Sequence, residues 1–186
     1  LSASFAQAFA EGAETVVLAV KPQVMDAVTR DLRGCIDAAV TIVSIAAGVP
    51  SSRVEQGLGG SPRVVRAMPN TPALAGMGAA ALCAGRYARE TDMERAERLL
   101  GAVGLCTRVS EAHMDAVTAV SGSGPAYVFY LMEAMMRAGR EQGMDEAVAR
   151  RLVLQTVAGA AALCRATGEA PEELRRRVTS RGGTTE

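Results

Sequence analysis

Tryptophan is absent from this sequence, aromatic residues make up only 3%, and His113 is the single histidine. Acidic and basic residues each number 20, so the chain has no basic surplus. A nucleic-acid-binding surface needs such a surplus, and single strands also need aromatic side chains for base stacking. We therefore expect no nucleic-acid partner. With one histidine and no Cys-x-x-Cys pair, we also expect no metal site.

The four cysteines, Cys35, Cys83, Cys106 and Cys164, are scattered. This spacing predicts small buried thiols in a reducing compartment rather than a disulfide framework. No secretory signal is visible, and no apolar run is judged long enough to span a bilayer, so we expect a soluble cytoplasmic protein without a membrane partner. The chain begins at Leu1 and stops at Glu186 just after a turn, which suggests a fragment of a longer protein.

Apolar runs rich in β-branched residues alternate with helical patterns up to about Ser110. Runs of this kind are typical of buried parallel strands. We predict strands at residues 15–20, 40–45, 63–68, 77–83 and 105–109, and helices at 4–11, up to about 32, 50–58 and 90–101. The alternation predicts an α/β fold, a Rossmann-type parallel sheet domain over residues 1–110.

Everything from residue 111 to Val178 can be helical, so residues 111–186 are predicted to form a second, all-helical domain. The helix expected at 145–166 is apolar or small on most of its circumference between Leu152 and Cys164. Such a helix is buried on more than one side. We therefore expect this domain to form a homodimer or a higher homo-oligomer. The three arginines at 175–177 are expected to face solvent.

Unusual sequences follow three of the predicted strands, at 19–22, 46–48 and 68–72. Ligands of doubly wound sheets lie beyond the carboxyl ends of the strands, and small residues there let a flat cofactor approach the backbone. The pattern predicts a cofactor crevice. The usual Gly-x-Gly-x-x-Gly phosphate loop is missing, so the Rossmann-type domain is incomplete and its first unit would lie upstream of Leu1.

The segment Ser121–Pro125 is predicted to be a glycine-rich loop that opens a helix, with Ser123 or Gly124 as N-cap. Free N–H groups at such a helix start suit a carboxylate, although an ordinary capped helix is the alternative. Residues 179–185 form a second anion-friendly loop, or else a helix end. A serine hydrolase is excluded because only His113 could act as base and no Gly-x-Ser-x-Gly elbow exists. Hydride transfer needs no such constellation, because the cofactor supplies the chemistry.

Five motifs, in this order, resemble those of the pyrroline-5-carboxylate reductases: residues 18–22, 44–48, 66–72, 115–127 and 180–185. The block at 115–127 is the most specific. The resemblance implies a Rossmann-type domain followed by a helical domain that interlocks with a partner subunit. It also implies reduction of 1-pyrroline-5-carboxylate to L-proline, the last step of proline biosynthesis, with NADPH or NADH.

The same resemblance assigns site residues. The cofactor would contact Ala19, Val20, Lys21, Pro22, Ala46, Ala47, Gly48 and Asn70. The substrate would contact Glu111, Thr184 and Thr185, with Ser180 nearby. No proton donor is identified. Arg181 stands where the family usually has proline, and the glycine-rich loop and a final helix are absent, so we expect weak or no activity from this chain by itself.

Two alternatives stay open. A β-hydroxyacid-type dehydrogenase would need a catalytic lysine in the helical part, and no lysine lies beyond Ser110. A non-catalytic dimerisation fragment is the other alternative. The choice between NADPH and NADH is read at a strand missing from this chain, so the sequence leaves it open.

Overall fold

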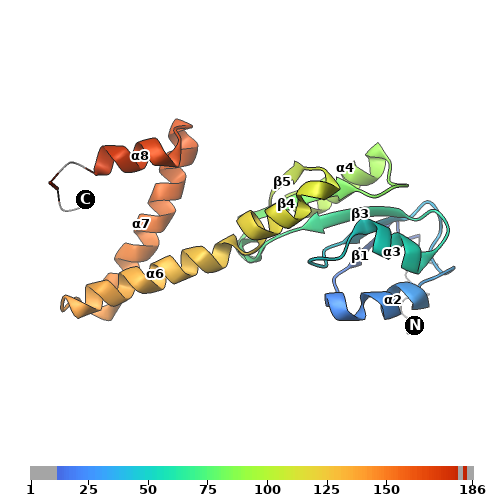
Figure 1. Cartoon of the computed structure of the whole chain (residues 1–186), viewed down its shortest axis with the longest axis horizontal. Coiled ribbons are helices and arrows are strands. Elements are labelled where there is room, and N and C mark those ends of the chain that lie inside the picture. The colour runs from blue at the N-terminus through green and yellow to red at the C-terminus, as the bar shows by residue number, and fades with distance from the viewer. Residues whose placement is uncertain (1–11, 180–181, 184–186) are drawn as a thin grey trace. The chain divides into compact units, whose positions relative to one another are not determined.

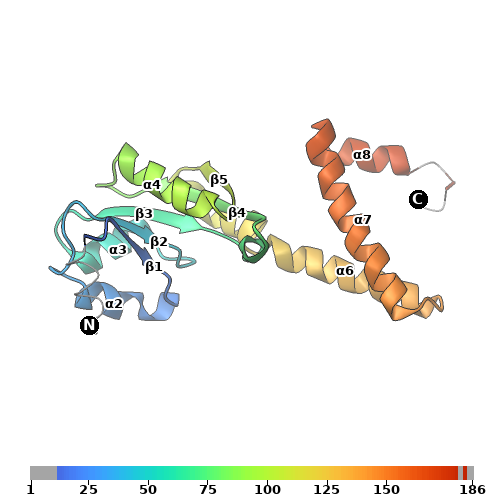
Figure 2. The same ribbon diagram turned by 180° about the vertical axis from the view of Figure 1, so that it is seen from behind.

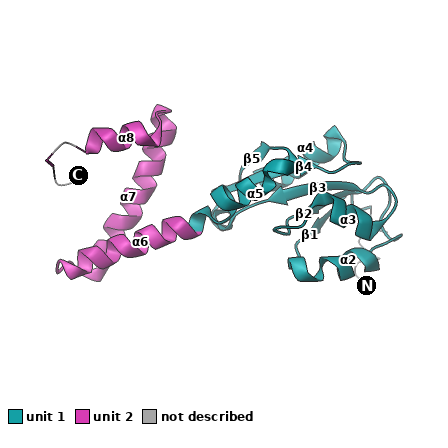
Figure 3. Ribbon diagram, in the orientation of Figure 1, with its two compact units in different colours: residues 1–125 teal, residues 126–186 magenta. Residues whose placement is uncertain are grey.

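The computed structural model describes residues 12–179 and 182–183. It divides into two compact units, residues 1–125 and 126–186, which Figure 3 shows in different colours. The helix expected at 4–11 lies outside the described residues, as do Ser180, Arg181, Thr184 and Thr185. The domain boundary expected between residues 110 and 111 stays a prediction.

Within the described part of unit 1, five strands form one sheet in the order β1–β2–β3–β4–β5. They are β1 (Thr15–Leu18), β2 (Thr41–Ser44), β3 (Arg63–Met68), β4 (Gly78–Ala84) and β5 (Gly104–Arg108). The first three strands are parallel and in register, so Leu18, Ser44 and Arg66 lie side by side. The β-branched apolar runs form these strands because both faces of the sheet are covered.

The predicted Rossmann-type fold class is confirmed, but the sheet is mixed rather than entirely parallel. Strand β4 runs antiparallel to β3, and β5 runs parallel to β4. A parallel connection needs a crossover of about a dozen residues or more. The residues between β3 and β4 include only the short 3₁₀ helix η2 (Thr71–Ala75), so the chain turns back on itself here.

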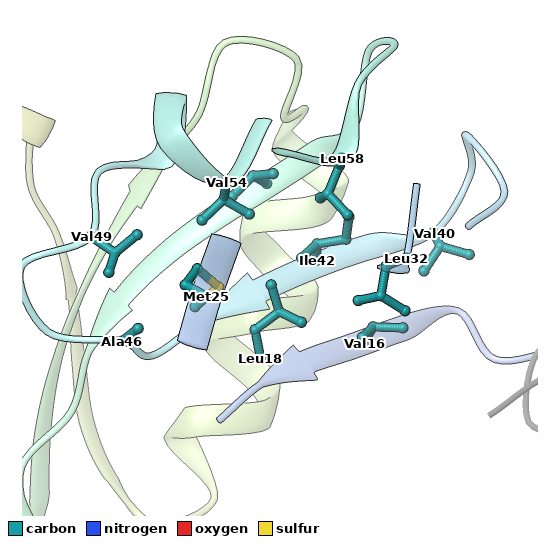
Figure 4. Close-up of a cluster of buried hydrophobic side chains, with 11 residues drawn as sticks. Val16, Leu18, Met25, Leu32, Val40, Ile42, Ala46, Val49, Val54 and Leu58 are labelled. Atoms are coloured by element: carbon teal, nitrogen blue, oxygen red, sulfur yellow. The ribbon is translucent and has the colours of Figure 1, made fainter. Parts of the chain in front are cut away.

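Helices cover both faces of this sheet (Figures 1 and 2). The 3₁₀ helix η1 (Pro22–Val24), α2 (Met25–Asp31) and α3 (Ser51–Leu58) lie on one face, and α4 (Glu90–Gly101) lies on the other. Figure 4 shows the core under α2 and α3, where Met25 and Val54 pack against Ile42 of β2 and all three are fully buried. Alternate strand residues point the other way: Val43, Val65 and Leu82 pack against Met93 and Ala96 of α4.

A buried carboxylate fixes the start of α4. Asp92 is fully buried, and its oxygens accept hydrogen bonds from the backbone N–H of Arg89 at 2.8 Å and from the Thr41 hydroxyl. Two donors satisfy the charge that burial would otherwise penalise. Helix α4 is thereby tied to the first residue of β2.

The described part of the second unit contains three helices: most of α6 (Gly124–Glu141), α7 (Glu146–Thr167) and α8 (Pro171–Val178). Asp145 caps α7 by accepting from the N–H groups of Ala147 and Val148. Large apolar side chains remain exposed on α6 and α7, namely Tyr127, Phe129, Tyr130, Leu131, Leu152 and Leu163. The arginines at 175–177 are exposed as expected, and Arg176 and Arg177 pair with glutamates at 169, 172 and 173.

Two expectations from the sequence are wrong in detail. Helix α7 has 22 residues and contains an 18-residue stretch with a mean hydropathy of 1.3, so by length and composition alone it could cross a membrane, contrary to the expectation that no apolar run is long enough. The same two properties suit a helix that packs against other protein. Cys83 is buried, whereas Cys35 is exposed rather than part of the core.

Candidate active site at the carboxyl edge of the sheet

The residues predicted to bind cofactor follow three neighbouring parallel strands. Residues 19–22 follow β1, residues 46–48 follow β2, and Asn70 follows β3. Because these strands are parallel and in register, the three segments lie at one edge of the sheet. The predicted position of these residues at a common edge of the sheet is therefore confirmed, while their contact with a cofactor stays a prediction.

The turn at 46–48 offers an open backbone surface. Ala47 and Gly48 are exposed, whereas Ala46 is buried. Gly48 has φ of +70°, a conformation that favours glycine, and a Cβ built there would meet nothing within 4 Å. The turn itself is fixed, because the N–H of Val49 donates to the Ala46 carbonyl at 3.4 Å and the Val49 side chain is buried.

Asn70 connects this edge to the segment after β5. Its Oδ1 accepts from the backbone N–H of Ala79 at 2.8 Å, and its Nδ2 donates to the carbonyl of Ser121 at 3.1 Å. In a regular helix the Ser121 carbonyl would accept from residue 125, but Pro125 has no N–H to give. The Asn70 side chain supplies the missing donor, so its first role is structural.

The Ser-Gly-Ser-Gly-Pro segment is helical rather than a loop. The chain passes from the 3₁₀ helix η3 (Glu111–His113) through α5 (Met114–Val117) into a π-helical turn, η4 (Thr118–Gly122), and α6 begins at Gly124. The N–H of Ser123 donates to the Thr118 carbonyl at 2.8 Å. The predicted loop with Ser123 as an N-cap open to an anion is therefore wrong.

Glu111 lies at the centre of a polar cluster within unit 1. Its Oε1 accepts from the backbone N–H of Ser51 at 3.2 Å and from Arg66 Nη1 at 2.7 Å. Its Oε2 accepts from the Ser51 hydroxyl at 2.7 Å and from the Cys83 thiol at 3.4 Å. These four donors occupy about all the acceptor positions of a carboxylate. Arg66 is 6% exposed and Glu111 36% exposed at the side chain, so the cluster is only partly covered on the side of Glu111.

The charges of the cluster decide which groups are ionised. Burial alone would raise the pKa of Glu111, but the hydrogen bonds from Ser51 and Arg66 outweigh it and hold the pKa below the usual value. Burial, together with the Glu111 charge, raises the pKa of Cys83 to about 12. Glu111 is therefore a carboxylate at neutral pH, and Cys83 is a neutral donor rather than a nucleophile.

Sequence reasoning missed Ser51, Arg66 and Cys83. The available signal was Arg66, a charged residue inside the otherwise apolar strand β3. In the sheet it pairs with Ser44 on one side and Cys83 on the other, which makes a polar row in a buried surface. The Ser44 hydroxyl is buried and has no hydrogen-bond partner in the described part of the chain. Of the predicted substrate contacts, only Glu111 lies among the described residues.

Comparison with known proteins gives the family. Residues 111–186 match the family model for pyrroline-5-carboxylate reductase dimerisation. A pyrroline-5-carboxylate reductase from Pseudomonas aeruginosa is 50% identical over 184 residues, which cover 98% of this chain and 67% of that protein. The chain belongs to the pyrroline-5-carboxylate reductase family.

Solved structures of reductases agree. The Coxiella burnetii pyrroline-5-carboxylate reductase superposes with a TM-score of 0.84 at 40% identity, covering 94% of this chain. The Plasmodium falciparum pyrroline carboxylate reductase, solved with NADP bound, gives a TM-score of 0.87 at 30% identity over 92% of the chain. The chain spans only 65% of each of these two proteins.

Proposed function

We propose that the protein reduces 1-pyrroline-5-carboxylate to L-proline with NADPH or NADH, the last step of proline biosynthesis. The observation that carries this proposal is 50% identity to a pyrroline-5-carboxylate reductase along nearly the whole chain. The relatives favour this reaction over the β-hydroxyacid-type dehydrogenase considered from the sequence.

The carboxyl edge of the sheet fits the nicotinamide end of such a cofactor. Residues 19–22 and 46–48 would hold it, because their exposed small residues and the open backbone at Gly48 leave room for a flat ring. Asn70 would keep the neighbouring turn in place through its bonds to Ala79 and Ser121. Bound NADPH or NADH would supply a hydride to the imine carbon of the substrate. No phosphate-binding glycine loop is present in this sequence, so the pyrophosphate would need residues from outside it.

The substrate carries a carboxylate and a ring imine. Hydroxyl groups of Ser180, Thr184 and Thr185 would bind the carboxylate as neutral donors, and the partly exposed Glu111 side chain would contact the ring. A negative charge near the ring would favour the protonated imine, which accepts hydride more readily than the neutral form.

The second unit supports self-association. It lies within the residues that match the dimerisation family model, and it leaves large apolar side chains exposed on α6 and α7. We propose that a second copy of the chain covers them in a homodimer or higher homo-oligomer. This occupant requires neither a membrane nor a nucleic-acid partner. A cytoplasmic location agrees with the four free thiols.

A chimera tests the function. It adds to this chain the segments of the P. aeruginosa relative that the chain does not cover. We expect the chimera to oxidise NADPH only when pyrroline-5-carboxylate is present and to form proline, whereas the chain alone shows little or no activity. A chimera that folds and binds NADPH but forms no proline would refute the proposed reaction. Full activity of the chain alone would refute the need for a phosphate loop.

A further inference from the structure

We propose that Glu111 is a positioning residue for the turn at 46–48, because its carboxylate closes the N-terminus of the helix that follows this turn. The inference rests on the proposed function, in which this turn receives the nicotinamide. In addition to any contact with substrate, Glu111 would affect cofactor binding indirectly, through the position of this turn.

The first step is the start of α3. Ser51 is its first residue, and an N–H at this position has no partner inside a helix. The N-cap residue is Pro50, which has no side-chain acceptor for it. Glu111 supplies the acceptor instead, for both the backbone N–H and the hydroxyl of Ser51. A negative charge at the positive end of the helix adds to this contact.

The second step is the link from the helix to the turn. Only Val49 and Pro50 separate Ser51 from Gly48. The Val49 side chain is 1% exposed, and its N–H is bonded back to Ala46. The proline ring fixes φ of Pro50 at −63°. With so little freedom in between, a displaced Ser51 would displace the turn as well.

The third step is the anchor of Glu111 itself. Arg66 holds the carboxylate from β3 and Cys83 holds it from β4, so it is attached to the sheet as well as to α3. Arg66 Nη2 lies 4.0 Å from Oδ1 of Asp115, whose side chain is almost fully exposed. The carboxylate therefore joins three elements of unit 1 at one point.

Ser51→Ala separates this role from substrate contact, because it removes one hydrogen bond to Glu111 and leaves the carboxylate in place. In the chimera we expect the KM for NADPH to rise about five-fold and the KM for pyrroline-5-carboxylate to stay within about two-fold. Ser52→Ala is the matched control, since Ser52 is the exposed next residue of α3. It should change neither constant.

Glu111→Gln should raise the KM for NADPH at least as much as Ser51→Ala. The KM for NADPH should rise no more in the double variant than in the single variant with the larger rise, because both substitutions break the same contact between Ser51 and Glu111. In the chain alone, Glu111→Gln should also shift the amide resonance of Ser51 far more than that of Ser52 in NMR spectra.

Three results would overturn the inference. They are an unchanged KM for NADPH in Ser51→Ala, an equal rise in both Michaelis constants, and additive effects in the double variant. If the unmutated chimera is active and any of these results is found, the inference fails but the proposed reaction stands. A chimera that folds and binds NADPH but forms no proline would refute the reaction alone, and the affinity of Ser51→Ala for NADPH, together with the Ser51 amide shift, would still decide the inference.

Discussion

Removing the Asn70 side chain should loosen the connection between β4 and the π-helical turn. Asn70→Ala removes two hydrogen bonds, one to the N–H of Ala79 and one to the carbonyl of Ser121. A part-buried hydrogen bond contributes roughly 1 kcal/mol, so the two together give about 2 kcal/mol. With a urea m-value of about 2 kcal/mol/M, the unfolding midpoint of unit 1 should fall by about 1 M.

Two further variants sharpen this test. Asn70→Asp keeps the acceptor for Ala79 but turns a second acceptor toward the Ser121 carbonyl, so it should destabilise the protein at neutral pH. Protonation restores a donor, so the difference from the unmutated protein should shrink in acid. Thr71→Ala, at the exposed next residue, is the control. Urea titrations followed by circular dichroism, with hydrogen exchange at the Ala79 amide, give the measurement. A midpoint no lower than that of Thr71→Ala would refute the reasoning.

Three other changes test separate parts of the structure. Gly104→Ala should cost about 3 kcal/mol, because the new Cβ would overlap the backbone carbonyl of Gly78, whereas Gly101→Ala has open space and should be tolerated in the same urea titration. Ala161→Glu should break self-association or abolish soluble expression, because it places a charge on the apolar surface of α7; sedimentation of the unmutated protein as a compact, stable monomer would contradict this. Burial raises the pKa of Cys83 from 9.0 to about 12, so its stabilising contribution is complete below pH 9 and is lost as the pH rises toward 12; Cys83→Ala should flatten that part of the alkaline stability profile.

Local sequence signals predicted most elements of unit 1. Strand β3 and helix α4 have the predicted ends, because an apolar β-branched run and a charged amphipathic stretch each have one stable local conformation here. The direction of β4 was missed, because the length of the connection, rather than the strand's own residues, decides it. The residue pattern of β4 is compatible with a parallel or an antiparallel strand.

The candidate site divides in the same way. The order and parallel direction of the first strands place residues 19–22 and 46–48 at one edge, and this could be read from the sequence. The partners of Glu111 could not, because Ser51 and Arg66 are distant in sequence and meet it only through tertiary packing. The helical state of Ser121–Pro125 was missed for a related reason: the donor that replaces Pro125 comes from Asn70, in another part of the chain.

Transfer of label from the cofactor tests the central claim most directly. The chimera would be supplied with NADPH that carries deuterium at the transferable position of the nicotinamide, together with pyrroline-5-carboxylate. The account predicts proline labelled on the ring carbon next to nitrogen, on the side away from the carboxylate. Unlabelled proline, or oxidation of the cofactor without any proline, would contradict it.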